Sequence, residues 1–136
     1  MAISPYIRLE TNEAAYLLDG LVSVGLKQIS DSQYSGQGQY PVIRAIQEGR
    51  LTYRRADPNE HWKSWGEMVR DLDATGHATG DCEDLSAAVV AELVYNGMPA
   101  RTYVYRSGGK LFHVVVKTDK WGLLDPSRAA GMEGNG

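Results

Sequence analysis

The residue of this chain best suited to covalent chemistry is its single cysteine, Cys82. It follows Asp81 in the sequence DCED, which matches the N-cap and capping box of a helix that runs on to Tyr95. The thiolate is the nucleophilic form of cysteine, and a free thiol has a pKa of about 8.5. Because a helix N-terminus lowers that pKa, the sequence predicts that Cys82 is an activated thiolate nucleophile.

Two residues further along the chain could complete a catalytic triad with this cysteine. His113 lies in the apolar run LFHVVVK, and Asp125 ends the run WGLLD. If these runs are antiparallel strands joined by a three-residue loop centred on Asp119, His113 lies directly opposite Asp125. A two-residue loop would place Pro126 there instead. In the first register His113 is the general base and Asp125 holds its imidazole in the required orientation.

Each of these residues also has a purely structural interpretation. A cysteine near a helix start is often a small buried hydrophobe, and an aspartate before a proline is often a turn residue. The order of Cys82, His113 and Asp125 along the chain, with a helix cap at the first and strands at the others, favours the catalytic interpretation.

The carboxylates around the cysteine oppose its activation. Asp81, Glu83 and Asp84 surround Cys82 with negative charge, which raises a thiol pKa. They could simply cap the helix and complement its dipole. Alternatively, Asp81 and Glu83 could help to hold a calcium ion, since hard cations prefer oxygen ligands.

Helices are predicted to precede a small sheet. A helix over 12–29 shows apolar spacing, a short one starts at Pro41 and stops at Gly49, and another follows the capping box of Ser64 and Glu67. After the Cys82 helix, which Asn96-Gly97 should end, the runs ARTYVY, LFHVVVK and WGLLD predict an antiparallel meander. The first helix should bury Ala15, Leu18, Val22, Leu26 and Ile29. The fold class predicted is α+β.

The chain length of 136 residues suits one domain. Within it we expect a helical part over about 1–61, a motif-bearing core over about 62–128, and a flexible Gly-rich tail over 129–136. The segments 31–40 and 74–80 are rich in small and polar residues and are predicted to be loops.

Composition excludes several classes of function. The net charge of −3 gives no electrostatic footprint for nucleic acid. The basic cluster from Arg50 to Arg55 is followed by Asp57 and Glu60 and is interpreted as solvated surface. A single cysteine allows no internal disulfide, and no apolar run approaches the length of a membrane span. No secretory signal is apparent, so we expect a soluble protein that is cytoplasmic or virion-associated.

The segments GDCEDLSAAVVAEL, FHVVVK and LLDPSR resemble the transglutaminase-like branch of the papain-like superfamily, and most closely the bacterial transglutaminase-like cysteine proteinases. The resemblance covers about residues 62–128. It implies a papain-like core whose Cys-bearing helix packs on a C-terminal antiparallel sheet. It also implies that Cys82 is the nucleophile, His113 the base and Asp125 the orienting acid. Some members use calcium near the cysteine, which again points to Asp81 and Glu83.

The function implied is a cysteine peptidase or amidase that acts on a protein or peptide through a thioester and requires no cofactor, in a phage or bacterial protein. Two alternatives stay open: a glutamine–amine acyltransferase and a non-catalytic binding module. The backbone N–H of Cys82 is one expected oxyanion donor. A second donor or substrate contact is expected from the 33–40 segment, at Gln39, or from Trp62 or Trp65. His77 could contact substrate or act as an alternative base; solvent exposure in a loop is its structural alternative.

Overall fold

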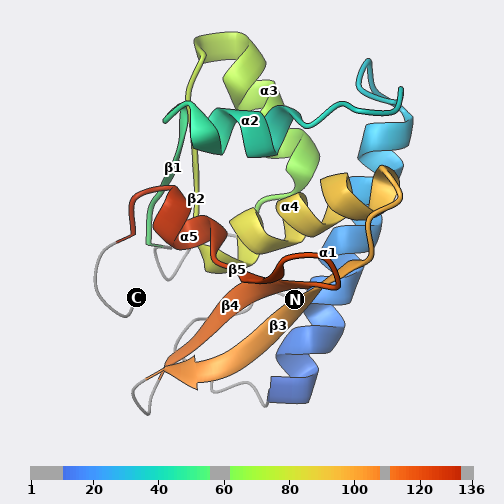
Figure 1. Cartoon of the computed structure of the whole chain (residues 1–136). Helices are drawn as coiled ribbons and strands as arrows, with labels where there is room; N and C mark the ends of the chain where they lie inside the picture. Colours follow the sequence, from blue (N-terminus) through green and yellow to red (C-terminus); the bar gives the residue numbers. More distant parts are fainter. Residues whose placement is uncertain (1–10, 56–61, 108–110, 133–136) are drawn as a thin grey trace.

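The computed structural model describes residues 11–55, 62–107 and 111–132. This part of the chain contains both helices and strands, and the α+β prediction is confirmed at that level (Figure 1). The helices are α1 (Thr11–Ser30), α2 (Pro41–Gln47), α3 (Trp65–Thr75), α4 (Cys82–Tyr95) and α5 (Pro126–Ala129). The strands are β1 (Leu51–Tyr53), β2 (Ala78–Gly80), β3 (Ala100–Ser107), β4 (Leu111–Thr118) and β5 (Gly122–Leu124).

The C-terminal strands form the predicted antiparallel meander, in the order β3-β4-β5. Strands β1 and β2 form a second, parallel pair in which Tyr53 lies opposite Gly80. The loop predicted for 74–80 and the solvated surface predicted for 50–55 are therefore wrong in part. Each strand has three residues, too few for an alternating pattern to be recognised in the sequence. Leu51, in the middle of the basic cluster, is completely buried.

Helix α4 is the centre of the fold. It lies between the meander and the helices α2 and α3, with α1 alongside it and the sheet (Figure 1). Its residues from Asp84 to Leu93 are all buried, as expected for a helix that is apolar on all sides. Small residues permit this close packing: a Cβ on Gly25 of α1 would lie only 3.0 Å from the Cβ of Ala91. The predicted helix α1 is confirmed, and of the five positions expected to be buried Leu18 and Ile29 lie in the core, whereas Ala15, Val22 and Leu26 are half-buried.

A buried carboxylate joins three helices in the core. Glu92 of α4 accepts the backbone N–H groups of Val42 (2.6 Å) and Ile43 (2.9 Å) and the indole Nε1–H of Trp65 (2.8 Å). The N-cap residue of α2, Tyr40, makes no capping hydrogen bond with its side chain. Glu92 therefore caps α2 from a neighbouring helix. Burial outweighs these hydrogen bonds and raises the pKa of Glu92 to about 7.

The C-terminal segment is packed as far as the structure describes it. Helix α5 follows Asp125, Ala130 and Met132 are buried, and Tyr53 N–H donates to the Ala130 carbonyl at 2.9 Å. The flexible tail predicted for 129–136 is thus wrong for 129–132, because these residues pair with β1; 133–136 lie outside the described residues. Among the helices that the structure describes, none combines the length and the apolar character needed to cross a membrane.

Candidate active site

Cys82 is the first residue of α4, as the sequence predicts. The Asp81 side chain accepts the Asp84 N–H at 3.1 Å, and the Asp84 side chain accepts the Asp81 N–H at 3.2 Å, which completes the capping box. The preceding Gly80 is closely packed: a Cβ there would lie 3.1 Å from the Met68 sulfur and 3.2 Å from the Asp84 Cβ, so these neighbours would have to move by a few tenths of an ångström. The motif GDCED therefore fixes where α4 begins and holds the cysteine at its N-terminus.

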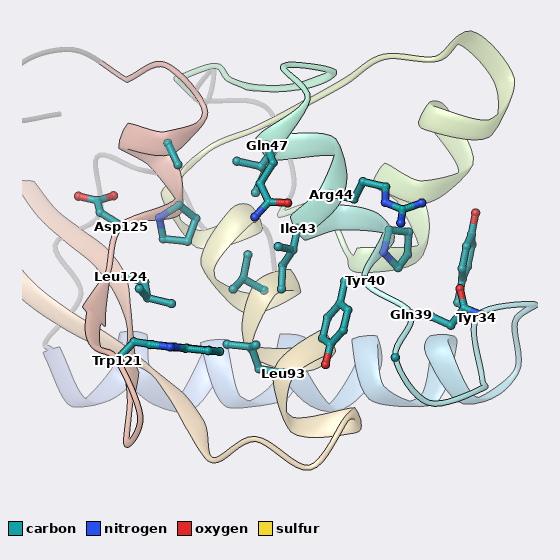
Figure 2. Close-up of a pocket in the computed structure, with 16 residues that line it drawn as sticks. Tyr34, Gln39, Tyr40, Ile43, Arg44, Gln47, Leu93, Trp121, Leu124 and Asp125 are labelled. Carbon is teal, nitrogen blue, oxygen red and sulfur yellow. The ribbon is translucent and has the colours of Figure 1, made fainter.

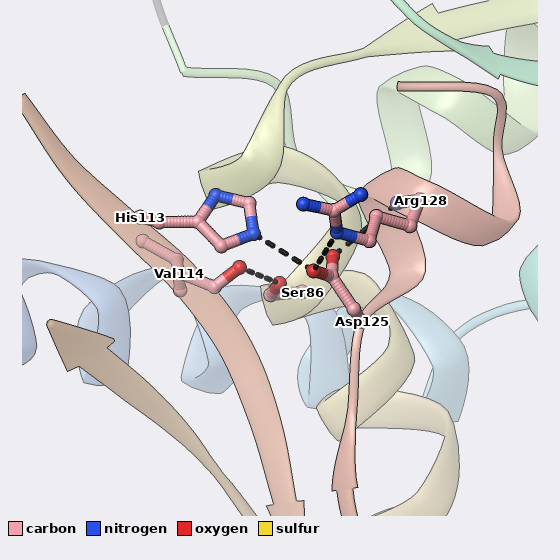
Figure 3. A network of polar contacts seen from close by, with 5 residues as sticks. All are labelled: Ser86, His113, Val114, Asp125 and Arg128. Atoms are coloured by element: carbon pink, nitrogen blue, oxygen red, sulfur yellow. Dashed lines mark hydrogen bonds and ion pairs between the residues drawn. The ribbon is translucent and has the colours of Figure 1, made fainter. Parts of the chain in front are cut away.

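His113 and Asp125 are in contact. The Nε2 atom of His113 lies 3.0 Å from Oδ2 of Asp125, and Arg128 Nε lies 3.5 Å from the same oxygen (Figure 3). The other carboxylate oxygen accepts the Arg128 backbone N–H at 3.3 Å, so Asp125 also caps α5. The contact with His113 and the turn role of Asp125 are compatible, because each uses a different oxygen.

The register that led to this pair is nevertheless wrong. Val116 lies opposite Leu124 and Thr118 opposite Gly122, so the loop is centred on Lys120 rather than on Asp119. Continued by one residue, this register places Asp125 opposite Val115, diagonally across from His113. A shift of two residues leaves every side chain on the same face of the sheet, and diagonal neighbours stay within reach of long side chains. The contact therefore survives the error.

Helix α4 carries Cys82 to the same part of strand β4. The Ser86 hydroxyl, one turn after Cys82, donates to the Val114 carbonyl at 3.0 Å (Figure 3). His113 is only 5 % exposed, and the ring of Tyr105 packs edge-to-face against it with 5.7 Å between centroids. With Nε2 bonded to Asp125, Nδ1 is the ring nitrogen left for proton transfer, and in Figure 3 it points towards the start of α4.

The electrostatics at Cys82 oppose a resting thiolate. Burial, followed by the charges of Glu83 and Asp81, raises the pKa of Cys82 well above its usual value, and the Val114 backbone bond lowers it only in part. The expectation that the helix N-terminus leaves Cys82 ionised is therefore corrected: burial, together with the charges of its carboxylate neighbours, outweighs the dipole. Burial and the Asp81 charge likewise raise the pKa of Asp84 to about 8.

Two of the carboxylates near Cys82 bond to backbone N–H groups. Asp81 and Asp84 cap α4, and Asp84 also accepts the Lys63 N–H at 2.8 Å. Within 11–55, 62–107 and 111–132 no group of three or more metal-ligating side chains is arranged to hold an ion. Calcium bound by Asp81 and Glu83 stays a hypothesis.

The other residues singled out in the sequence are dispersed. Trp62 is half-buried and packs, like Cys82, against the cluster formed by α1, α4 and the sheet. Trp65 lies in the core with its indole N–H bonded to Glu92, so it does not serve as an oxyanion donor. His77 is exposed at the far end of β2, whose rise of about 3.3 Å per residue carries it away from Cys82. Gln39 is exposed and lines a cavity whose opposite end is formed by Asp125.

Tyr53 is a site residue that the sequence does not reveal. The β1–β2 register places it opposite Gly80, next to the Asp81–Cys82 start of α4. Burial raises the pKa of its phenol, and the Cys82 and Asp81 charges raise it further, which places the phenol within electrostatic range of both groups. Nothing in the sequence around it predicts this position, because β1 is so short.

No protein-family model, curated protein or solved structure matches this chain. The fold and the site themselves therefore define its class. It is an α+β protein with a helix-capped cysteine, a histidine–aspartate pair on the adjoining meander, and a tyrosine on a short parallel strand beside the cysteine.

Proposed function

We propose that the protein is a thiol-dependent acyl-transfer enzyme of the transglutaminase-like type within the papain-like superfamily, a cysteine peptidase or amidase that cleaves an amide bond in a protein or peptide. The observation that carries the proposal is the 3.0 Å bond between His113 and Asp125, next to the point where Ser86 of the Cys82 helix donates to the Val114 carbonyl of β4. The helix cap, the buried imidazole and the register of β1 add further support.

In the proposed reaction, Nδ1 of His113 takes the thiol proton as the Cys82 sulfur attacks the substrate carbonyl carbon. The resulting oxyanion accepts the Cys82 backbone N–H, which has no partner within its helix, and the Tyr53 hydroxyl. Collapse breaks the C–N bond, and the leaving amine takes the proton from His113. Water then attacks the thioester, again giving its proton to His113, and the acid leaves as the thiol re-forms.

The raised pKa of Cys82 determines how this enzyme differs from one with a preformed thiolate. Because burial and the neighbouring carboxylates favour the neutral thiol, proton transfer to His113 must accompany attack instead of preceding it. Asp125 then stabilises the imidazolium as it forms. An acyltransferase would use the same residues, with a second amine in place of water.

A non-catalytic module is the second candidate, and one specific observation favours it. Cys82 is half-buried and its pKa is raised, which are the properties of a structural cysteine. In that case Asp125 would serve to cap α5 and to hold His113 in place.

Reaction with an activated ester distinguishes the acyl-transfer enzyme from the non-catalytic module, and it requires no knowledge of the natural substrate. Incubation with p-nitrophenyl acetate should release a stoichiometric burst of p-nitrophenol and leave the acetyl group on Cys82, located by mass spectrometry. The burst should be absent in Cys82→Ala and slowed about 100-fold or more in His113→Ala. Dimethylcasein with dansylcadaverine then distinguishes amine incorporation from hydrolysis. A burst no faster in the folded protein than in the denatured chain would support the non-catalytic module.

Replacing Tyr53 by phenylalanine should lower kcat for ester or amide cleavage about 10- to 100-fold with little change in KM, because it removes one oxyanion donor. Tyr105→Phe is the matched control, since it loses a hydroxyl but keeps the ring that contacts His113. Steady-state kinetics of both variants provide the measurement. Equal rates for Tyr53→Phe and the unmodified protein would remove Tyr53 from the mechanism.

A further inference from the structure

A cavity of about 690 Å³ lies between α2, α4 and the β5–α5 segment (Figure 2). Its volume falls within the roughly 300–1,000 Å³ that is typical of ligand sites. Its floor is apolar, with Val89 and Leu93 from α4 and Leu124 from β5. Tyr40 and Trp121 lie on either side of Leu93. An apolar floor between two aromatic rings suits an aromatic side chain.

The cavity adjoins the candidate active site through Asp125. This residue forms one end of its lining, and in Figure 2 the carboxylate points away from the other labelled residues, in keeping with its bond to His113. Helix α4 links the two regions as well. Val89 lies seven residues after Cys82, which corresponds to about 10 Å along the helix. That separation is the length of about three extended residues.

The charged groups around the cavity favour an anion. Arg44 is exposed on its wall, and Lys120 Nζ lies 5.3 Å from the centroid of the Trp121 ring. The negative charge of Asp125 is already engaged by His113 and Arg128. The amide side chains of Gln39 and Gln47 add neutral hydrogen-bonding groups to the lining. A ligand that combines an aromatic ring with a carboxylate matches both the surface and its charge.

We infer that this cavity binds a segment of the polypeptide substrate that carries an aromatic side chain next to an acidic one. The aromatic side chain packs between Tyr40 and Trp121, and the carboxylate pairs with Arg44. The inference rests on the proposed function, for which it supplies the substrate class. Binding itself does not require the thiol, so the two can be tested separately.

The test uses Trp121 as a reporter in the Cys82→Ala protein. The chain has three tryptophans, so the indole N–H signals of Trp62 and Trp65 serve as internal references in the same NMR spectrum. Trp121→Phe assigns the reporter signal. We expect the blocked tripeptide acetyl-Gly-Phe-Asp-amide to shift the Trp121 signal with a Kd of about 1 mM, equivalent to about 4 kcal/mol of binding free energy. The two reference signals should move little.

Three comparisons define the chemistry. Replacing the peptide's aspartate with asparagine should weaken binding about fivefold, and replacing its phenylalanine with alanine should abolish it. Arg44→Gln should weaken binding of the acidic peptide to the level of the asparagine peptide and leave the latter unchanged. Arg70→Gln is the matched control, because Arg70 is exposed on α3 and does not line the cavity.

The inference is overturned if 10-fold more peptide than the expected Kd leaves the Trp121 signal unmoved, or if Arg44→Gln binds both peptides as the unmodified chain does. A burst of ester cleavage together with no peptide binding would refute the cavity alone. Peptide binding with no burst would refute the enzyme and leave a peptide-binding module.

Discussion

The rate at which iodoacetamide alkylates Cys82 should rise about tenfold for each pH unit from 6 to 9, with no plateau near neutrality. Only the thiolate reacts, and its fraction rises tenfold per pH unit while the pH is below the pKa. Burial and the Glu83 and Asp81 carboxylates keep that pKa well above its usual value. The rate is measured by mass spectrometry of the labelled chain. Over the whole range the rate constant should change about 1,000-fold.

Two variants test the cause of this behaviour. Glu83→Gln should speed alkylation at pH 9 several-fold, because it removes the carboxylate whose charge, after burial, does most to raise the thiol pKa, and it leaves the capping box intact. His113→Ala should slow ester cleavage yet leave alkylation at pH 9 almost unchanged, since iodoacetamide needs no general base. A rate already at its maximum by pH 6 would show instead that Cys82 rests as a thiolate paired with imidazolium.

Replacing Glu92 by alanine should lower the free energy of unfolding by about 4 kcal/mol. The change leaves the N–H groups of Val42, Ile43 and Trp65 without their acceptor and opens a cavity in the core. Each buried donor left unsatisfied costs about 1–3 kcal/mol. Urea denaturation followed by circular dichroism measures the loss. A loss below about 1 kcal/mol would mean that water or a rearranged α2 satisfies these donors.

The same residue gives stability a defined pH dependence. The pKa of Glu92 is raised from 4.5 to about 7 on folding, so the folded chain holds its proton more tightly than the unfolded chain. Its contribution to stability is therefore complete below pH 4.5 and is lost as the pH rises through 7, by about 3 kcal/mol in all. Asp84, with a pKa raised to about 8, acts in the same direction.

Glu92→Gln is the control for this effect. It keeps the shape of the side chain and one acceptor but cannot ionise, so it should cost about 1 kcal/mol at pH 5 and flatten the decline between pH 5 and 8. An undiminished decline in Glu92→Gln would assign the pH dependence to Asp84 and its neighbours.

Local chemistry in the sequence was sufficient to predict several elements of this protein. The capping boxes at Ser64 and Asp81 place the starts of α3 and α4, because they involve residues three apart whose bonds form within one turn. The strand runs predict the meander for the same reason, since alternation and turn residues are local signals. The position of Cys82 at a helix start also follows from these signals.

The remaining features of the fold and the site depend on contacts between segments that lie far apart in the sequence. The β1–β2 pair joins segments some 27 positions apart, and so does the Glu92–Trp65 bond that withdraws Trp65 from the site. Strands of three residues are too short to show an alternating pattern of apolar residues in the sequence. A buried hydrogen bond between distant residues produces no such pattern either. Tyr53, the packing of 129–132 and the cavity beside Asp125 all depend on such contacts.

Cys82, His113 and Asp125 show which features of the candidate site the sequence determined and which only the tertiary structure decided. Residue type and order suggest Cys82, His113 and Asp125, and the even spacing of a strand keeps His113 and Asp125 on one face even though the loop is displaced by one residue. The protonation state of the cysteine does not follow from its position at a helix N-terminus. It depends on how deeply the thiol is buried and on which charges surround it, and only the tertiary structure determines these.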